Sequence, residues 1–235
     1  MVAAVSSCGH APATTPGHPS DPVTSPSVDS APDTSAASSA SSTTGDAGHS
    51  TEKTADSPPK VVLHTGDSMV GYYACLEKAL APHFESLGAK YVQDAVTSAA
   101  IVTFDRNDHF TKMLASQNPD LVLITLGAND VFLPSPQRLA KNIASIAKKT
   151  EGRRCFWMGP PVWKKDTGIV EVIRQNCAPC VFFDASSLKL ERRPDGIHPD
   201  DKGGEAWATA FWDFYRAQPA ASTSAGSAGQ PLMER

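Results

Sequence analysis

The first 59 residues contain no aromatic side chain, and all 17 Phe, Trp and Tyr residues of the 235-residue chain lie between Tyr72 and Tyr215. Most of residues 1–59 are Ala, Ser, Pro, Thr or Gly. A segment without large apolar side chains cannot bury enough surface to offset the entropy lost on folding. We therefore predict a disordered tether at residues 1–59, one globular domain at 60–217 and a disordered tail at 218–235.

Two further absences exclude classes of function. No stretch approaches the roughly 20 apolar residues that a membrane-spanning helix needs. The chain also lacks a run of basic residues, and its formal charge is −5 in residues 1–59 and +1 in residues 60–217. Since nucleic-acid binding needs a concentrated positive face, the sequence does not indicate a nucleic-acid-binding protein.

The segment around Cys8 gives information on the cellular location of the protein. Residues 5–9, Val-Ser-Ser-Cys-Gly, resemble the end of a bacterial lipoprotein signal, in which the cysteine becomes the lipidated first residue. One interpretation is a signal encoded upstream of Met1 and a lipid anchor at Cys8, with a protein exported to the cell envelope. The alternative is a chance cysteine in a low-complexity segment. The Ser, Thr and Pro content favours export, and membrane contact is expected only through such an anchor.

The cysteines of the predicted domain favour a disulfide over a metal site. Cys177 and Cys180 lack the second closely spaced Cys/His pair that would complete a zinc site. A redox dithiol usually opens a helix after a strand, whereas this pair precedes a predicted strand. Cys155 begins the neighbouring predicted strand, so we predict a structural disulfide from Cys155 to either Cys177 or Cys180. Such a bond indicates an oxidising compartment.

Short apolar runs alternate with helical patterns from residue 60 onward, as in an α/β fold. The predicted strands are 60–65, 90–95, 120–126, 154–158 and 180–184, and the predicted helices are 69–87, 108–117, 136–150, 167–176 and 201–217. Ser135 is the expected N-cap of the third helix. Five strands, each followed by a helix or crossover, predict a parallel sheet covered on both faces.

Three polar clusters follow predicted strands, at the edge where ligands bind in such sheets. In Gly66-Asp67-Ser68, the serine is expected at a helix start, with an exposed hydroxyl and an unused backbone N–H. These properties suit a nucleophile, and the alternative is a residue that only caps the helix.

The second cluster is Gly127-Ala128-Asn129-Asp130, directly after the most apolar strand. Gly127 permits a sharp turn, and Asn129 offers an amide donor to a developing oxyanion. The alternative is an ordinary turn.

The third cluster, Asp195-Gly196-Ile197-His198-Pro199, places a carboxylate three residues from an imidazole. A carboxylate that orients a histidine stabilises its protonated form, as a general base requires. The alternative is a polar surface loop.

In the order Ser, Asn, Asp, His, these clusters resemble the motifs of the SGNH hydrolases, also called GDSL esterases/lipases, over residues 60–217. The resemblance implies a flavodoxin-like three-layer α/β/α sandwich with a five-stranded parallel sheet. It also implies ester hydrolysis without a metal or cofactor. Ser68 would be the nucleophile, His198 the base and Asp195 its orienting carboxylate, while Asn129 and the Ser68 backbone N–H would hold the oxyanion.

One position departs from the family pattern. The second motif of the family supplies a glycine whose backbone N–H completes the oxyanion hole, and residues 95–100 contain no glycine. Ser98 aligns best with it, so the predicted oxyanion hole consists of Ser68, Ser98 and Asn129. A backbone N–H does not require glycine, but a side chain would narrow the pocket, and losing one such donor costs about 10²–10³ in rate.

The resemblance implies a serine esterase, and together with the predicted location it suggests a short acyl ester as substrate, such as an acetyl group on an envelope carbohydrate. The alternatives are an O-acetyltransferase with the same site and a non-catalytic binding module of the same fold. Trp163 either stacks on a sugar or packs within its loop. His64 and His109 are interpreted as structural or exposed, and Asp67 and Asp130 as turn and capping groups.

Overall fold

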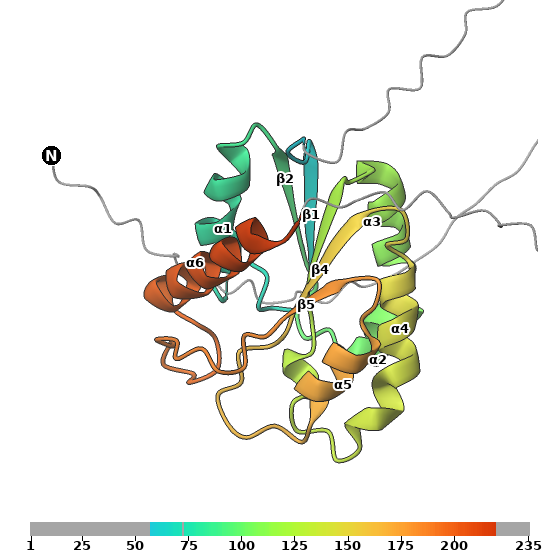
Figure 1. The fold of residues 1–235 in the computed structure, drawn as a ribbon. Helices are drawn as coiled ribbons and strands as arrows, with labels where there is room; N and C mark the ends of the chain where they lie inside the picture. Colours follow the sequence, from blue (N-terminus) through green and yellow to red (C-terminus); the bar gives the residue numbers. More distant parts are fainter. Residues whose placement is uncertain (1–56, 72, 220–235) are drawn as a thin grey trace, which may run out of the picture. The chain divides into compact units, whose positions relative to one another are not determined.

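The computed structural model describes residues 57–71 and 73–219 (Figure 1). The tether predicted at residues 1–59 lies outside the described residues except for its last three. The predicted anchor at Cys8 and positions 220–235 of the predicted tail also lie outside them. These expectations therefore stay predictions.

The centre of the domain is a sheet of five parallel strands. They are β1 (Val61–Gly66), β2 (Lys90–Ala95), β3 (Leu121–Thr125), β4 (Arg154–Met158) and β5 (Val181–Phe183). Their spatial order is β2-β1-β3-β4-β5, and each neighbouring pair is parallel. Every residue of the central strand β3 is buried, as its apolar sequence predicts. The direction of winding reverses between β1 and β3, which creates a crevice beyond their carboxyl ends.

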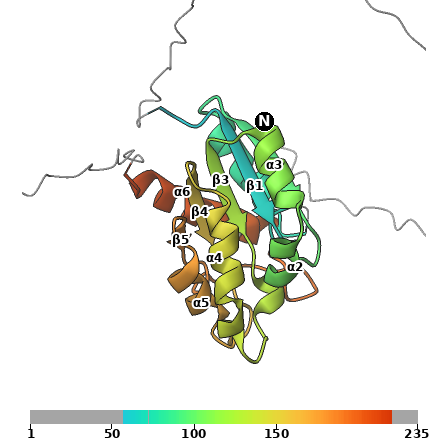
Figure 2. The ribbon, with the colours of Figure 1, turned by 90° about the vertical axis from the view of Figure 1, so that its right-hand side faces the viewer.

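Helices cover both faces of this sheet (Figures 1 and 2). One face carries α1 (Leu76–Glu85) and α6 (Asp201–Ala217), and the other carries α2 (Ile101–Arg106), α3 (His109–Gln117), α4 (Ala140–Lys148) and α5 (Ile169–Asn176). Alternate strand residues enter the two cores, so that Phe156 faces α1 and α6 while Trp157 faces the other helices. The predicted three-layer α/β/α sandwich is confirmed. Within the described ranges, no helix is long and apolar enough to cross a membrane.

The first helix begins later than the sequence predicts. The expected start was residue 69, but α1 begins at Leu76. The Asp67 carboxylate accepts the Met69 backbone N–H at 2.9 Å, and the Cys75 N–H donates to the Gly71 carbonyl within a series of turns. A side chain that captures a nearby N–H competes with helix formation. Ser68 therefore does not lie at a helix N-terminus, and that part of the argument for its reactivity is wrong.

Two other local expectations need correction. The segment after Ser135 begins as the 3₁₀ turn η2 (Pro136–Leu139), and the Ser135 side chain makes no capping hydrogen bond. The short helix α2 was not predicted, and its N-terminus is held by a carboxylate from another loop, as described below.

The predicted disulfide joins Cys155 to Cys180. Cys155 lies in β4 and Cys180 directly precedes β5, so the bond connects the starts of neighbouring strands. Cys177 lies outside this bond, and its buried thiol lies 3.6 Å from the Cys180 carbonyl oxygen.

Candidate active site

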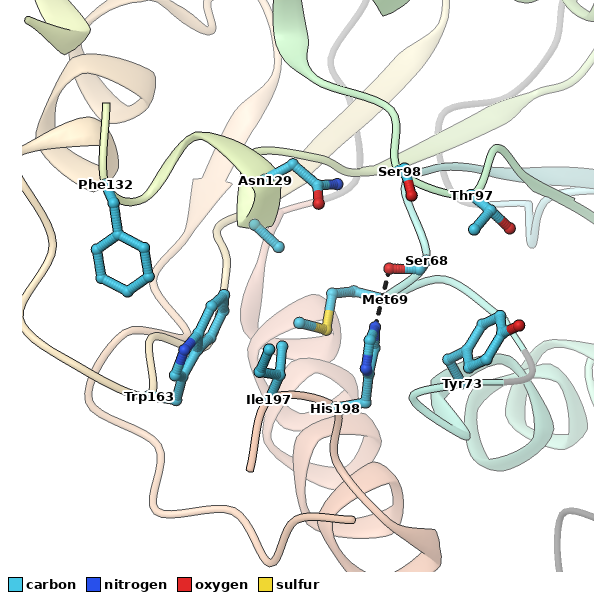
Figure 3. Close-up of a pocket in the computed structure, with 11 residues that line it drawn as sticks. Ser68, Met69, Tyr73, Thr97, Ser98, Asn129, Phe132, Trp163, Ile197 and His198 are labelled. Atoms are coloured by element: carbon cyan, nitrogen blue, oxygen red, sulfur yellow. Dashed lines mark hydrogen bonds between the residues drawn. The ribbon is translucent and has the colours of Figure 1, made fainter. Parts of the chain in front are cut away.

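Four loops bring the predicted residues together at the carboxyl end of the sheet. Ser68 follows β1 by two residues, Ser98 follows β2, and Asn129 lies in the 3₁₀ turn η1 (Ala128–Asp130) after β3. Asp195 and His198 lie in the loop between β5 and α6. Figure 3 shows Ser68 and His198 at the centre of one pocket, with Ser98 and Asn129 along one side of it.

Gly66 allows the loops that carry Ser68 and Asn129 to approach closely. It has φ of 151°, and a Cβ at this position would lie 1.8 Å from the carbonyl oxygen of Thr125. Any side chain would therefore separate the ends of β1 and β3. The glycine of the first motif thus sets the distance between the Ser68 loop and the Asn129 loop.

A chain of hydrogen bonds links Ser68, His198 and Asp195. The Ser68 hydroxyl lies 2.9 Å from His198 Nε2, and His198 Nδ1 lies 2.8 Å from Asp195 Oδ2. With the proton on Nδ1, the imidazole donates to the carboxylate and accepts the serine hydroxyl at Nε2. This tautomer prepares His198 to remove the proton of Ser68.

The Asp195 carboxylate is held in place by its own loop. Its Oδ1 accepts the backbone N–H groups of Ile197 at 2.8 Å and His198 at 3.0 Å. Partial desolvation raises the pKa of Asp195, but the hydrogen bonds from the His198 ring and from these two amides outweigh it, so the net pKa is below its usual value. The carboxylate therefore stays ionised and orients the imidazole.

Three residues that line the pocket, Ser68, Ser98 and Asn129, offer N–H donors to a ligand. Within the described part of the chain, the backbone N–H groups of Ser68 and Ser98 have no protein acceptor. The Asn129 side-chain amide donates one N–H to the Ala99 carbonyl at 3.0 Å, which fixes its orientation and leaves the second N–H for a ligand. Such donors suit a developing oxyanion.

Ser98 adopts the backbone conformation that a glycine would favour. Its φ is 61°, in the left-handed region that non-glycine residues seldom occupy. The family position is thus occupied by a serine that keeps a glycine-like backbone. Its side chain faces the pocket and narrows it beside Ser68 (Figure 3).

Two buried carboxylates fix the loops that carry these donors. Asp67 Oδ2 accepts the backbone N–H groups of Gly127 at 3.2 Å and Ala128 at 3.1 Å, joining the Ser68 loop to the Asn129 loop. Burial raises the pKa of Asp67 to about 7, although these amides lower it. Asp130 Oδ2 accepts the Ile101 N–H at 3.0 Å, which anchors the start of α2, and burial raises the pKa of Asp130 too.

Aromatic side chains line both ends of the pocket, whose volume is about 370 Å³. The rings of Phe132 and Trp163 meet edge to face at 5.7 Å at one end. At the other end the Tyr73 ring lies 5.4 Å from the His198 ring (Figure 3). Tyr73 and Phe132 are 44% and 50% exposed, and neither was predicted as a site residue. Sequence alone cannot separate an exposed aromatic residue in a loop from one that packs in the core.

Solved structures that share this fold include two esterases and a lipase/acylhydrolase. Esterase EstA from a Pseudoalteromonas species is 18% identical, with a TM-score of 0.53, over 67% of this chain and 97% of that one. A carbohydrate acetylesterase family member from Sinorhizobium meliloti is 20% identical, with a TM-score of 0.53 and the same coverage. The chain has the SGNH hydrolase fold.

A lipase/acylhydrolase from Enterococcus faecalis has the same architecture, at 16% identity and a TM-score of 0.50, over 69% of this chain and all of that one. No protein-family model and no curated protein matches the sequence. At these identities the likeness concerns the fold. The argument for chemistry therefore depends on the geometry of the residues described above.

Proposed function

We propose that this protein is a serine esterase that hydrolyses a carboxylic ester through an acyl-enzyme on Ser68. The observation that carries the proposal is the hydrogen-bonded chain from Ser68 to His198 to Asp195, which opens on a pocket beside unused N–H donors. A nucleophile, a base, an orienting carboxylate and oxyanion donors are the groups that acyl transfer requires.

In the first half of the reaction, His198 Nε2 takes the Ser68 proton as Oγ attacks the ester carbonyl carbon. The negative charge that develops on the carbonyl oxygen is held by the Ser68 and Ser98 N–H groups and by the Asn129 amide. The protonated His198, stabilised by Asp195, then donates its proton to the leaving alcohol oxygen as the carbon–oxygen bond breaks. In the second half, His198 removes a proton from water, which attacks the acyl-enzyme and releases the acid.

The proposed substrate is a short acyl ester, in particular an acetyl ester of a carbohydrate. The Ser98 side chain occupies a position that the family pattern gives to glycine, and this reduces the space beside the nucleophile. The structural neighbour from Sinorhizobium meliloti is described as a carbohydrate acetylesterase, which supports the same class of substrate.

An exported location is part of the proposal. The Cys155–Cys180 disulfide supports an oxidising compartment, because cytosolic proteins rarely keep structural disulfides. Membrane attachment through Cys8 would be tested by mass spectrometry of the protein purified from its own cells, in which a diacylglyceryl group on Cys8 is expected.

The test of the activity is hydrolysis of p-nitrophenyl acetate by the full chain and by Ser68→Ala. We expect hydrolysis by the wild type and a loss of roughly 10⁴-fold or more in kcat for Ser68→Ala, with the same melting temperature. Ser187→Ala, a change in a loop outside the pocket, serves as the control. Equal rates in the wild type and Ser68→Ala would contradict the proposal.

A second readout separates hydrolysis from acyl transfer. The products are analysed with and without an added sugar acceptor, and hydrolysis predicts free acetate as the main product in both. More acetylated sugar than acetate would favour the O-acetyltransferase alternative, with Ser68 still the nucleophile.

A further inference from the structure

Two further hollows adjoin the catalytic pocket, between the carboxyl end of β2, the loop that follows it, and the helices α2 and α3. Thr97 and Ser98 line the catalytic pocket and also a neighbouring hollow of about 150 Å³. Thr97 in turn lines a third hollow of about 520 Å³, which the second hollow joins at Asn107 and His109. We call the second and third hollows together the β2 groove. Its polar lining consists of Asp94, Thr97, Ser98, Thr103, Asn107, His109 and Lys112.

The polar groups of the β2 groove are held in fixed positions. The Asp94 side chain is 9% exposed, and its two carboxylate oxygens accept the Thr65 hydroxyl at 2.7 Å and His109 Nε2 at 2.6 Å. Asn107 Oδ1 accepts the His109 backbone N–H at 2.8 Å, so the amide group of Asn107 is oriented at the edge of the groove. The ring of His109, held at one nitrogen, is 43% exposed. These bonds limit the reorganisation needed for binding.

Donors remain available to a ligand in this groove. The Asn107 side-chain N–H groups and the Lys112 ammonium group have no acceptor within residues 57–71 and 73–219. The hydroxyls of Thr97 and Ser98 can both donate and accept. The floor beneath these groups is apolar, with Val96 and the buried ring of Phe110. Hydrogen-bonding edges above an apolar floor match a sugar ring, which carries hydroxyls at its rim and C–H groups on its faces.

The two ends of the catalytic pocket differ in polarity. Phe132, Trp163 and Ile197 line the end away from Thr97, whereas the hydroxyl-bearing side chains of Tyr73 and Thr97 lie at the other end, as Figure 3 shows. The acyl and alcohol parts of an ester leave the tetrahedral carbon in different directions. An apolar end suits the acyl group, and the polar β2 groove suits a hydroxylated alcohol.

We propose that the alcohol part of the substrate is an oligosaccharide whose further sugar units occupy the β2 groove, beyond Thr97 and Ser98. This inference rests on the proposed esterase activity and adds to it the size of the substrate. Asn107 and Lys112 bind sugar units remote from the reacting bond, so they affect long substrates and leave small esters unchanged.

The test compares substrates of increasing length. O-acetylated xylose, xylobiose and xylotetraose, and the corresponding O-acetylated chito-oligosaccharides, are hydrolysed by the full chain, and kcat/KM is measured for each. In at least one series we expect kcat/KM to rise about tenfold from one to four sugar units, as two or three added hydrogen bonds allow.

The variant Asn107→Ala/Lys112→Ala is expected to remove that rise and to keep the wild-type rate on p-nitrophenyl acetate. Both side chains are exposed, but Asn107→Ala also removes the hydrogen bond to the His109 backbone N–H at the start of α3, so the melting temperature of the variant is measured beside that of the wild type. Lys148→Ala on α4 is the surface control. The proposal that sugar units bind in the β2 groove would be overturned by either of two results. One is a wild-type kcat/KM that does not depend on substrate length in either series, and the other is a variant with the same length dependence as the wild type. Ser68-dependent cleavage of p-nitrophenyl acetate would persist in either case. If no Ser68-dependent cleavage of p-nitrophenyl acetate were found, the proposed esterase activity itself would be contradicted.

Discussion

Two histidines in this domain have both ring nitrogens hydrogen-bonded, and their surroundings differ in charge and in access. His64 in β1 is fully buried, with Nδ1 2.6 Å from the Tyr91 hydroxyl and Nε2 2.8 Å from the Thr125 hydroxyl. His198 is partly exposed and lies between the Asp195 carboxylate and the Ser68 hydroxyl. Only the second has a charged partner and a route to solvent.

This difference decides what each imidazole can do. Burial among neutral groups lowers the pKa of His64 to about 3, because no nearby charge compensates for the lost hydration of the imidazolium ion. His64 therefore stays neutral and serves packing. His198 can accept a proton during a reaction, because Asp195 stabilises the imidazolium that forms. The same side chain is thus structural in a dry neutral site and suited to catalysis beside a carboxylate.

The largest expected effect comes from removing the proposed base. We expect His198→Gln to lower kcat for p-nitrophenyl acetate by roughly 10⁴–10⁶-fold, because the amide cannot take the Ser68 proton. The melting temperature should hardly change, since the loop of His198 is close to solvent. His64→Gln is the comparison: it should keep most of the activity and lower stability. A reversal of these two patterns would contradict the assignment of roles.

A second change makes the partner of His198 neutral, like those of His64. Asp195→Asn is expected to lower kcat by about 10³–10⁴, because an amide at this position favours the wrong imidazole tautomer and no longer stabilises the imidazolium. The loss should be smaller than for His198→Gln, as the ring itself remains. Steady-state kinetics at several pH values would check this, and a rate above one-tenth of the wild type would mean that Asp195 only shapes the loop.

The sequence predicted the contact between His198 and Asp195 but not the contacts of His64, for a physical reason. Asp195 and His198 are three residues apart, so their contact is local and can be inferred from spacing. The partners of His64 are Tyr91 and Thr125, which are brought close only by strand pairing. The strands β1, β3 and β4 were also predictable, because their apolar runs reflect burial, whereas the half-exposed edge strand β2 gives a weaker pattern.

Other features depended on contacts that spacing does not reveal. Asp67 holds the Met69 N–H, so the chain after Ser68 forms turns where helical periodicity predicted a helix. The start of α2 depends on Asp130, 29 residues further along the chain. Tyr73 and Phe132 were missed because aromatic residues usually pack inside, whereas these two line an open pocket.

The neutral state of His64 predicts a pH-dependent effect on stability. The folded pKa of about 3 lies below the unfolded value of 6.5, so the unfolded chain binds the extra proton between these pH values. The wild type therefore loses stability through His64 as pH falls from 6.5 toward 3. In His64→Gln this contribution is absent, so the destabilisation by the variant should shrink by about 2 kcal/mol between pH 6.5 and pH 4.5.

Urea unfolding of both proteins at several pH values would measure the difference in free energy of unfolding. Because both proteins contain the same carboxylates, the difference isolates the histidine. A pH-independent difference would contradict this, because it would mean that His64 binds a proton as readily in the folded protein as in the unfolded chain.

The smallest effect is expected where a backbone group, not a side chain, is the proposed donor. Ser98→Gly keeps the backbone N–H and the left-handed conformation, so kcat for p-nitrophenyl acetate should stay within about threefold of the wild-type value. The loss of an oxyanion donor would instead lower kcat by about 10²–10³-fold. The free energy of unfolding should change by no more than about 1 kcal/mol, because the relief of backbone strain at φ 61° is offset by the greater freedom of glycine in the unfolded chain.

Asn129→Ala provides the contrast. Its donor is lost with the side chain, so kcat should fall by about 10²–10³-fold. If Ser98→Gly lost as much as Asn129→Ala, the Ser98 hydroxyl would be the donor, and the serine at this position would be a part of the catalytic machinery in its own right.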